Sequence, residues 1–393
     1  MYSGKCPLTI GNVQSGQPGQ KQTHYTMPRI WKELKEQADM ASRAQRVAEF
    51  NAQHAWRKRG IAMTPVKYGV SGSFAQALVN VYADGSVNVH HSGVEIGQGI
   101  HTKVLAVASF ELGKVVGSPV PMSLLRAADT DTAVVPNMKM TGGSTSSEES
   151  CFAIAKACRQ LVDRLAPIHA KMAETAEGKV TWEALIAKAK GDNVNLMSQG
   201  CFRATDDGPP KDGDGAADDG TSGEWDYLNY GAAVSEVEVD IVTGEVEILR
   251  TDLLYDCGKS LNPAVDIGQC EGGFMMGVGH LLREKVWIDE STGQLVSDGT
   301  WEYKPPSAMD VPKEFNVRLL EDTRFDKGFL SSKASGEPPL VLSTSVAMAA
   351  REAVRAARTQ TAALKDTGGD AFFRLDTPIM VDDIANAADP SRS

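Results

Sequence analysis

The stretch Ser335-Gly336-Glu337-Pro338-Pro339-Leu340 places one carboxylate between a glycine and two prolines, directly before a long helical pattern. Proline favours the first turn of a helix because it lacks an N–H group that would have no partner there, so Pro338 and Pro339 predict a helix start. Glu337 then lies where unpaired N–H groups and the positive end of the helix dipole meet. A lone glutamate at this place is usually a favourable first-turn charge. A carboxylate held rigidly in its ionised form can also act as a general base.

Length and composition predict a soluble, cytoplasmic protein of two packed subdomains. The 393 residues exceed the size at which a single hydrophobic core usually stops growing. The net charge of -11 argues against a nucleic-acid or anionic-membrane partner, which would require a basic surface. No apolar run approaches the ~20 residues that span a bilayer, and the N-terminus lacks the apolar core of a signal peptide.

The cysteines and histidines predict no metal site on this chain. The sequence has no C-x-x-C pair, and its six cysteines are too few for a disulfide scaffold at this length. His90 and His91 end a strand pattern, but no third ligand accompanies them. We therefore expect no zinc ion or iron–sulfur cluster to be bound by side chains of the chain itself.

The pattern of hairpins and helices predicts an α+β fold, with mixed and antiparallel sheets packed against helices and a cofactor cleft between two subdomains. We divide the chain into an extended arm (1–30), a first subdomain (31–204), an acidic Gly/Pro-rich loop (205–225) and a second subdomain (226–393). Asp84-Gly85 and Thr243-Gly244 each separate two alternating apolar runs, which predicts two β-hairpins.

Periodicity and composition place the remaining elements. One or two amphipathic helices are expected over 30–58, ending in the basic run 56–60. Further helices are expected from residue 100, over 149–173, through 273–278, after Pro338 and near Asp382. Further strands are expected around 122–125, 285–288 and 315–320.

Three corners rich in small residues are expected to open helices, as Glu337 does. They are Gly97-Gln98-Gly99, Gly142-Gly143-Ser144-Thr145-Ser146 and Gly268-Gln269. Glycine permits close backbone approach, and a helix start offers N–H donors to an anion. The first corner also fits a simple tight turn, and the second fits an ordinary helix cap. Several such helix starts around one space predict a site for a large, polar, anionic cofactor.

Four longer motifs resemble the molybdenum-binding region of the xanthine dehydrogenase and aldehyde oxidase family. They begin at Val94-Glu95-Ile96-Gly97-Gln98-Gly99, Ser235-Glu236-Val237-Glu238, Ser260-Leu261-Asn262-Pro263 and Ser332-Lys333-Ala334-Ser335. They follow the order of the family and its approximate spacing, and the resemblance extends from about Pro28 to about Ala385.

The resemblance implies a molybdenum hydroxylase, which oxidises aldehydes or purine-like N-heterocycles with water as the oxygen source and carries molybdenum on molybdopterin. Glu337 matches the general base of the family. The residues that match cofactor contacts are Gly97, Gln98, Gly99, Ser144, Ser146, Gln269 and Gly336. Gly142 and Gly143 match the lining of the substrate pocket. The family places a phenylalanine soon after Tyr68-Gly69-Val70-Ser71, and the phenylalanine that follows here is Phe74.

Members of the family carry another half of the molybdenum region upstream, and those of eukaryotes also carry iron–sulfur and flavin (FAD) domains. The resemblance therefore implies a fragment, a truncated gene model or a subunit that needs those parts as partners, within a homodimeric complete enzyme. Residues 254–260 and 298–301 resemble plant aldehyde oxidases more than xanthine dehydrogenases, so aldehydes are the favoured substrates. The alternative hypothesis is a cofactor-binding or assembly module that has no turnover on its own.

Overall fold

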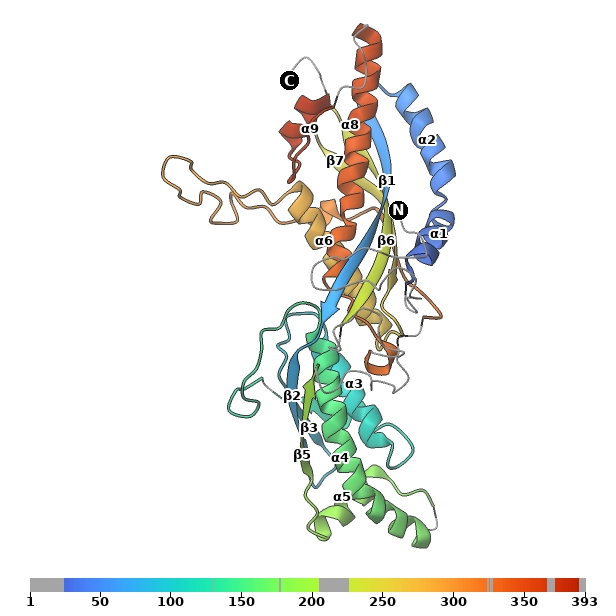
Figure 1. The fold of residues 1–393 in the computed structure, drawn as a ribbon, viewed down its shortest axis with the longest axis vertical. Helices are drawn as coiled ribbons and strands as arrows, with labels where there is room; N and C mark the ends of the chain where they lie inside the picture. Colours follow the sequence, from blue (N-terminus) through green and yellow to red (C-terminus); the bar gives the residue numbers. More distant parts are fainter. Residues whose placement is uncertain are drawn as a thin grey trace, which may run out of the picture.

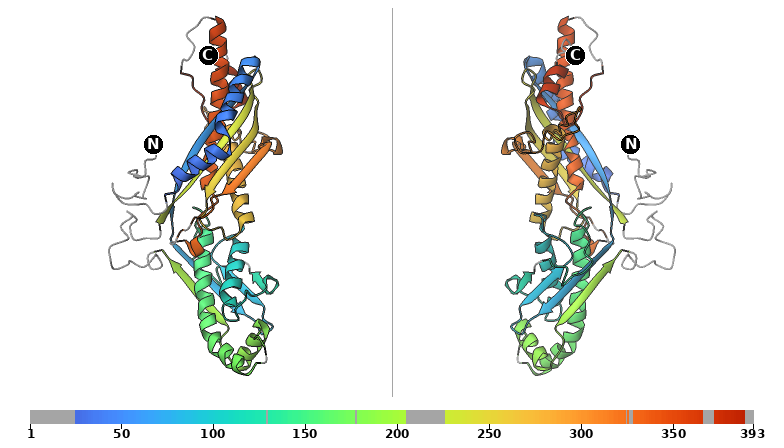
Figure 2. Two further views of the ribbon diagram at one scale, coloured as in Figure 1. Left: turned by 90° about the vertical axis from the view of Figure 1, so that its right-hand side faces the viewer. Right: turned by 90° about the vertical axis from the view of Figure 1, so that its left-hand side faces the viewer.

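The computed structural model describes residues 25–128, 130–176, 178–204, 226–323, 325, 328–365 and 372–388. These residues form an elongated molecule in which two helix-covered sheets lie end to end (Figure 1, Figure 2). The predicted loop 205–225 and most of the predicted arm lie outside the described residues. The helix α1 (Met27–Gln37) already begins within the predicted arm.

The first sheet has the strand order β1-β6-β7-β8. β1 (Arg57–Ser71) pairs with β6 (Asp226–Asp240) along its whole length, and β6 pairs with β7 (Val246–Asp256); both pairs are antiparallel. β8 (Glu314–Leu319) lies parallel to β7. Alternate residues of β6 enter two different cores, since Ala233 packs toward the helices α6 (Pro263–Leu282) and α8 (Thr344–Lys365), while Ala232 packs toward α1. Helices therefore cover both faces of this sheet.

The second sheet has the order β4-β3-β2-β5. β2 (Phe74–Val81) pairs antiparallel with β3 (Val87–His91) and with β5 (Met197–Arg203), and the short β4 (Leu125–Ala127) lies parallel to β3. The alternating burial along β2 and β3 shows that one face of the sheet packs on a core. That core is completed by α3 (Ile100–Gly113), α4 (Ser146–Thr175) and α5 (Trp182–Gly191).

The same close contact joins sheet and helix in both units. A Cβ atom on Gly60 of β1 would lie 1.9 Å from the carbonyl oxygen of Ala349 in α8. A Cβ atom on Gly200 of β5 would lie 1.8 Å from the carbonyl oxygen of Ala153 in α4. Only glycine lets the strand and the helix backbone approach this closely.

Three 3-10 turns and three further helices complete the described elements. They are the 3-10 turns η1 (Met122–Leu124), η2 (Ala308–Asp310) and η3 (Phe329–Ser331), and the helices α2 (Met40–Gln53), α7 (Pro338–Leu342) and α9 (Val381–Ala388). No helix among the described residues combines the length and the apolar character that crossing a membrane requires.

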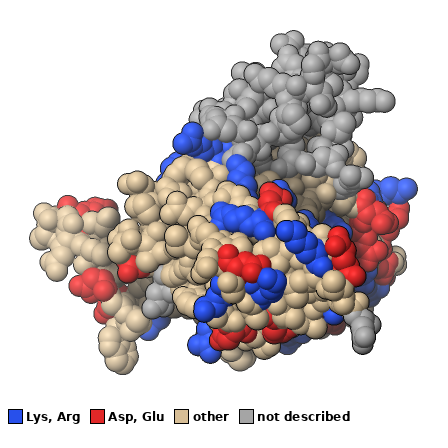
Figure 3. All heavy atoms as spheres, turned by 90° about the horizontal axis from the view of Figure 1, so that it is seen from below, with Lys and Arg blue, Asp and Glu red and all other residues tan. Residues whose placement is uncertain are grey.

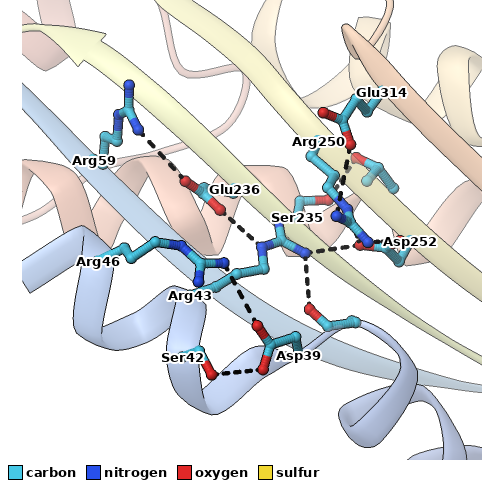
Figure 4. A network of polar contacts seen from close by, with 12 residues as sticks. Asp39, Ser42, Arg43, Arg46, Arg59, Ser235, Glu236, Arg250, Asp252 and Glu314 are labelled. Atoms are coloured by element: carbon cyan, nitrogen blue, oxygen red, sulfur yellow. Dashed lines mark hydrogen bonds and ion pairs between the residues drawn. The ribbon is translucent and has the colours of Figure 1, made fainter.

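A buried arginine fastens α2 to the first sheet (Figure 4). Arg43 donates from Nε to Glu236 of β6 at 2.8 Å and from Nη1 to Asp252 of β7 at 2.7 Å. The Arg43 side chain is 3% exposed. The surface is charged with both signs, and on the face seen in Figure 3 lysine and arginine are interspersed with aspartate and glutamate.

The predicted α+β class with two sheets and both predicted hairpins is confirmed. Four expectations were wrong. Residues 122–124, expected to form a strand, are the 3-10 turn η1, and the strand β4 begins only at Leu125. The basic run 56–60 begins strand β1 instead of ending a helix. Residues 285–288 form no strand, and the pairing there is one isolated bridge between Ile288 and Leu295. Residues 31–71, assigned by sequence to the first subdomain, belong to the sheet of the second, because β1 pairs with β6 and α1 and α2 pack on that sheet.

Candidate functional site

A cavity of about 570 Å³ lies where the starts of α3 and α4 in one unit face α6 and α7 in the other. Eight residues that the sequence assigned to the site line it: Gly97, Gln98, Gly142, Ser144, Ser146, Gln269, Gly336 and Glu337. Segments separated by more than 200 residues in the sequence thus meet around one space. The predicted convergence of these corners is therefore observed in the structure.

Glu337 is the N-cap residue of α7, and its carboxylate is exposed toward the cavity. Its Oε1 accepts a hydrogen bond from the backbone N–H of Gly143 at 3.2 Å. Its Oε2 accepts hydrogen bonds from Ser144 Oγ at 3.2 Å and from the hydroxyl of Tyr68. Donors of this kind stabilise the ionised form of a carboxylate and fix its orientation. They come from the α4 corner and from β1, and not from the N–H groups of α7 itself.

In the corner before α3, a carboxylate of the same loop accepts hydrogen bonds from the backbone. The carboxylate of Glu95 accepts hydrogen bonds from the N–H groups of Gly97, Gly99 and His101 at 3.1, 2.9 and 3.1 Å. Burial acts to raise the pKa of Glu95, but these three donors outweigh it and hold the pKa below its ordinary value. Glu95 therefore accepts three of the N–H groups around the start of α3, and the role of this corner in binding a cofactor stays a prediction.

Gln98 lines the cavity and also stabilises the same loop. Its Nε2 donates to the carbonyl oxygen of Val94 at 2.8 Å, and its Oε1 accepts from the N–H group of Ile96 at 2.7 Å. Gly97 has a φ of +103°, and a Cβ atom there would meet nothing within 4 Å. The loop thus turns sharply and leaves free space at Gly97.

The second corner opens α4 as the sequence predicts, since α4 begins at Ser146. Ser144 has a φ of +58°, a left-handed conformation that turns its hydroxyl toward Glu337. Ser144 and Ser146 both line the cavity, so two hydroxyl groups from this corner face it.

The third corner does not open a helix. α6 begins at Pro263, where Asn262 caps it by accepting from the N–H group of Val265 at 3.3 Å, so Gly268 and Gln269 lie inside the helix. Pro and the preceding Asn form the stronger start signal. Gln269 still lines the cavity, and its Oε1 would lie 3.1 Å from a Cβ atom on Gly336.

Three of the predicted site residues lie outside the lining of the cavity. Gly99 is the N-cap residue of α3, and a Cβ atom there would lie 2.8 Å from Val265. Gly143 contributes its N–H group to Glu337. Phe74 begins β2, opposite Arg203 of β5. Phe74 as a wall of the substrate pocket stays a prediction.

Buried ion pairs lie directly beneath the cavity, and the sequence reasoning did not single them out. Lys103 binds Asp266 at 2.7 Å, with side chains 9% and 3% exposed. Lys333 binds Asp256 at 2.8 Å, with side chains 2% and 0% exposed. Both lysines line the cavity. They lie within quoted motifs, but lysine is almost never buried, so sequence alone gives little reason to expect it there.

Glu148, in the first turn of α4, is a buried carboxyl that also lines the cavity. Tyr227 Oη donates to Glu148 Oε2 at 2.5 Å, and Ser332 Oγ donates to Oε1 at 3.4 Å. Burial raises the pKa of Glu148 to about 7, against the opposing effect of Tyr227 and Lys103. Sequence reasoning left a helix cap and a cofactor-binding corner as alternatives here and did not single out Glu148.

No group of three His, Cys, Asp or Glu side chains in the described part of the chain is arranged to hold a metal ion. His91 and His101 stack edge to face at 5.2 Å between ring centres. Two imidazoles without a third ligand do not complete a metal site.

The lining suits a polar, anionic cofactor. Gly97 and Gly272 leave open space where a side chain would otherwise stand, while a side chain on Gly336 would crowd Gln269 and Ser144. Serine hydroxyls, glutamine amides and two buried lysines supply donors around that space. Apolar residues such as Leu261, Met276 and Leu340 complete the lining, as is usual for cofactor sites.

Comparison with known proteins agrees with this arrangement. A family model described as the molybdopterin cofactor-binding domain matches residues 33–312. The chain is 41% identical over 357 residues to abscisic-aldehyde oxidase of Arabidopsis thaliana, which covers 90% of this chain and 26% of that protein. It is 43% identical over 357 residues to probable aldehyde oxidase 3 of Oryza sativa subsp. japonica, which covers 90% of this chain and 24% of that protein. The chain thus spans about a quarter of the length of these relatives.

Solved structures share the fold. Quinoline 2-oxidoreductase from Pseudomonas putida 86 superposes with a TM-score of 0.71 at 20% identity, covering 94% of this chain and 46% of that one. Aldehyde oxidoreductase from Desulfovibrio desulfuricans superposes with a TM-score of 0.69 at 22% identity, covering 94% of this chain and 36% of that one. Together with the matched family model, these similarities establish that the chain belongs to the molybdopterin cofactor-binding domain of the aldehyde oxidase and xanthine dehydrogenase family.

Proposed function

We propose that this chain is the catalytic part of a molybdenum hydroxylase that oxidises aldehydes, with Glu337 as its general base. The observation that carries the proposal is the carboxylate of Glu337, which three donors from two elements hold at the open face of the shared cavity. A general base must be fixed in position and accessible to substrate, and this arrangement meets both requirements.

The residues present fit the cofactor. Gln98, Ser144, Ser146 and Gln269 line the cavity with hydrogen-bonding groups, and Gly97 and Gly336 keep space open for a planar ring system. We propose that these residues hold molybdopterin and its phosphate, with Lys103 and Lys333 adding positive charge beneath it. When bound, the molybdenum of this cofactor supplies two-electron redox chemistry and an oxygen derived from water.

Within this site, Glu337 takes up the proton that the water-derived nucleophile loses during its attack on the carbonyl carbon. Overall, an aldehyde and water yield a carboxylic acid, two protons and two electrons. Gly142 lines the cavity beside Glu337, and Gly143 donates to it, so both leave room for the substrate carbonyl next to the base. The aldehyde oxidases among the curated relatives favour aldehydes over purine-like heterocycles as the substrate class.

Turnover requires groups that lie outside the chain described above. We propose that an upstream half of the molybdenum region closes the cavity, and that iron–sulfur and flavin domains or subunits receive the two electrons. The complete enzyme is proposed to be a cytoplasmic homodimer. This proposal is supported by the finding that the chain spans only about a quarter of the length of the aldehyde oxidases that it matches.

The second candidate is a cofactor-binding or assembly module that holds molybdopterin without catalysis. It requires the cofactor-lining residues of the cavity but no chemical role for Glu337. The two candidates differ in whether Glu337 has a chemical task.

The test uses the chain alone and the chain joined to the upstream and redox parts of a plant relative. Bound molybdenum and pterin are measured first, followed by aldehyde-dependent dye reduction. We expect the joined protein to reduce dye with aldehyde, and Glu337→Gln to keep the cofactor while losing at least about a thousandfold in kcat. Cofactor binding without turnover in the joined wild type would favour the assembly module. Full turnover by Glu337→Gln would remove Glu337 from the mechanism.

A further inference from the structure

We propose that Tyr68 is a positioning residue for Glu337. Its phenol holds Oε2 of the carboxylate and thereby leaves Oε1 as the oxygen that accepts the proton. This inference rests on the proposed function, because it assigns atoms within the proposed base. Tyr68 lies in β1, 269 residues away from Glu337 in the sequence.

The hydrogen bonds distribute unevenly over the two carboxylate oxygens. Oε2 accepts from the Tyr68 hydroxyl and from Ser144 Oγ. In the part of the chain that the structure describes, the hydrogen bond to Oε1 comes from the Gly143 N–H at 3.2 Å. Each carboxylate oxygen has two lone pairs, so Oε2 is filled while Oε1 keeps one lone pair for a proton.

The position of Tyr68 is fixed by packing that does not depend on the Glu337 loop. Its ring contacts the core of the second sheet and also the core between the first sheet and α6 and α8. The strand β1 is paired along its whole length with β6, and this fixes the backbone of Tyr68. A phenol anchored in this way can orient a loop residue, whereas a side chain on a mobile segment cannot.

The strand neighbour of Tyr68 holds the same loop. Tyr68 pairs with Asn229 of β6, and Asn229 Nδ2 donates to the carbonyl oxygen of Ala334 at 2.5 Å. Tyr255 of β7 donates to the same oxygen at 2.6 Å. Three side chains of neighbouring strands thus hold the segment from Ala334 to Glu337, and Tyr68 is the one that reaches the carboxylate.

The phenol is a dependable donor. Burial, followed by the hydrogen bond to Glu337 and the negative charge of Glu337, raises the pKa of Tyr68 well above its ordinary value. Tyr68 therefore remains protonated across the pH range in which an enzyme works and keeps donating to Oε2.

The first test needs neither cofactor nor turnover. The full chain is labelled with ¹³C at the ζ carbon of tyrosine, and the resonance that disappears in Tyr68→Phe is assigned to Tyr68. We expect Glu337→Gln to shift this resonance, because the phenol then donates to a neutral amide in place of a carboxylate. Tyr303 donates to Glu284 in the same way but outside the cavity, so its resonance should respond to Glu284→Gln and not to Glu337→Gln. A Tyr68 resonance that keeps its position in Glu337→Gln would overturn the contact.

The second test uses the joined enzyme described above. Tyr68→Phe removes one hydroxyl and keeps the ring, and we expect kcat to fall about tenfold while KM changes less than about twofold. The matched variant Tyr303→Phe should keep both constants. An unchanged kcat in Tyr68→Phe would overturn the positioning role. If the wild-type joined enzyme fails to oxidise aldehydes, the proposed function fails, and the resonance test still decides whether Tyr68 and Glu337 are coupled.

Discussion

Ser144 and Glu337 form a reciprocal pair of hydrogen bonds. The Oγ atom of Ser144 accepts from the backbone N–H of Glu337 at 2.9 Å and donates to its Oε2 at 3.2 Å. One hydroxyl therefore fixes both the start of α7 and the carboxylate that it carries. The hydroxyl comes from the corner before α4, so the base is held across the cavity by the opposite unit.

The first prediction concerns this hydroxyl. Ser144→Ala in the joined enzyme should lower kcat about tenfold, because a hydrogen bond to a charged group is lost and the N–H of Glu337 loses its partner. Ser144 has a positive φ of +58°, which strains alanine, so Ser144→Gly separates the two effects. We expect the same loss of kcat in both variants and a lower thermal stability in Ser144→Ala.

Ser86 provides the matched control. Its Oγ donates to Asp84 at 2.7 Å in the exposed turn of the first hairpin, outside the lining of the cavity. Ser86→Ala should keep kcat. If Ser144→Gly also keeps kcat, the reciprocal pair has no role in catalysis.

The second prediction concerns the buried Arg43 of Figure 4. Arg43→Ala should destabilise the chain by about 3 kcal/mol, because Glu236 and Asp252 lose their buried partner, while Arg250 still binds Asp252. Arg46, one turn further along α2, is 61% exposed and lies 3.6 Å from Asp39. Arg46→Ala should cost less than about 0.5 kcal/mol in denaturant unfolding. Equal losses in the two variants would contradict the role given to burial.

Sequence predicted those parts of the fold that depend on neighbouring residues. Asp84-Gly85 lies at a hairpin turn because a short loop with glycine at a positive φ of +86° fits the twist of the paired strands. Pro338 lies at a helix start because of its missing N–H. The glycine corners and Glu337 surround one cavity, as the four motifs in register suggested.

Contacts between distant residues could not be predicted in this way. The pairing of Met63 with Val234 joins residues far apart in the chain, and an alternating pattern fixes which face of a strand is buried but not which strand it meets. The contact between Tyr68 and Glu337 could not be predicted for the same reason. Residues 57–71 were assigned by sequence to the first subdomain, whereas β1 belongs to the sheet of the second. The ion pairs of Lys103 with Asp266 and of Lys333 with Asp256 likewise join residues far apart in the chain, so no sequence pattern indicated them.

The third prediction tests the close contact between strand and helix. Gly200→Ala should destabilise the chain by at least about 3 kcal/mol, because its Cβ atom would lie 1.8 Å from the backbone oxygen of Ala153 in α4. Gly191, the last residue of α5, faces open space, and Gly191→Ala should leave stability unchanged or raise it slightly. Thermal unfolding of both variants measures the difference. A stable Gly200→Ala protein would show that β5 and α4 can separate freely.

The fourth prediction concerns the pH dependence of stability. Burial raises the pKa of Glu148 from 4.5 to about 7, so between these values the folded chain holds a proton that the unfolded chain has released. Stability should therefore fall as the pH rises from about 4.5 to about 7, by about 3 kcal/mol from this group alone. Glu148→Gln keeps the shape of the side chain and removes the titration. Denaturant unfolding at several pH values should show a flatter pH dependence in the variant across this window.

Glu111 is a buried carboxyl whose pKa is shifted in the opposite direction to that of Glu148. Burial acts to raise its pKa, but hydrogen bonds from Arg159 and Lys114 outweigh burial and lower it. The carboxyl of Glu111 therefore binds its proton more readily in the unfolded chain than in the folded chain. Ionised Glu111 stabilises the fold at a pH above the ordinary carboxyl pKa, and this stabilisation is lost as the pH falls through the lowered pKa of the folded chain. Relative to wild type, Glu111→Gln should be least stable at neutral pH and should recover in acid, whereas Glu148→Gln should gain most at neutral pH. The same pH response in both variants would contradict the opposite environments of the two carboxyls.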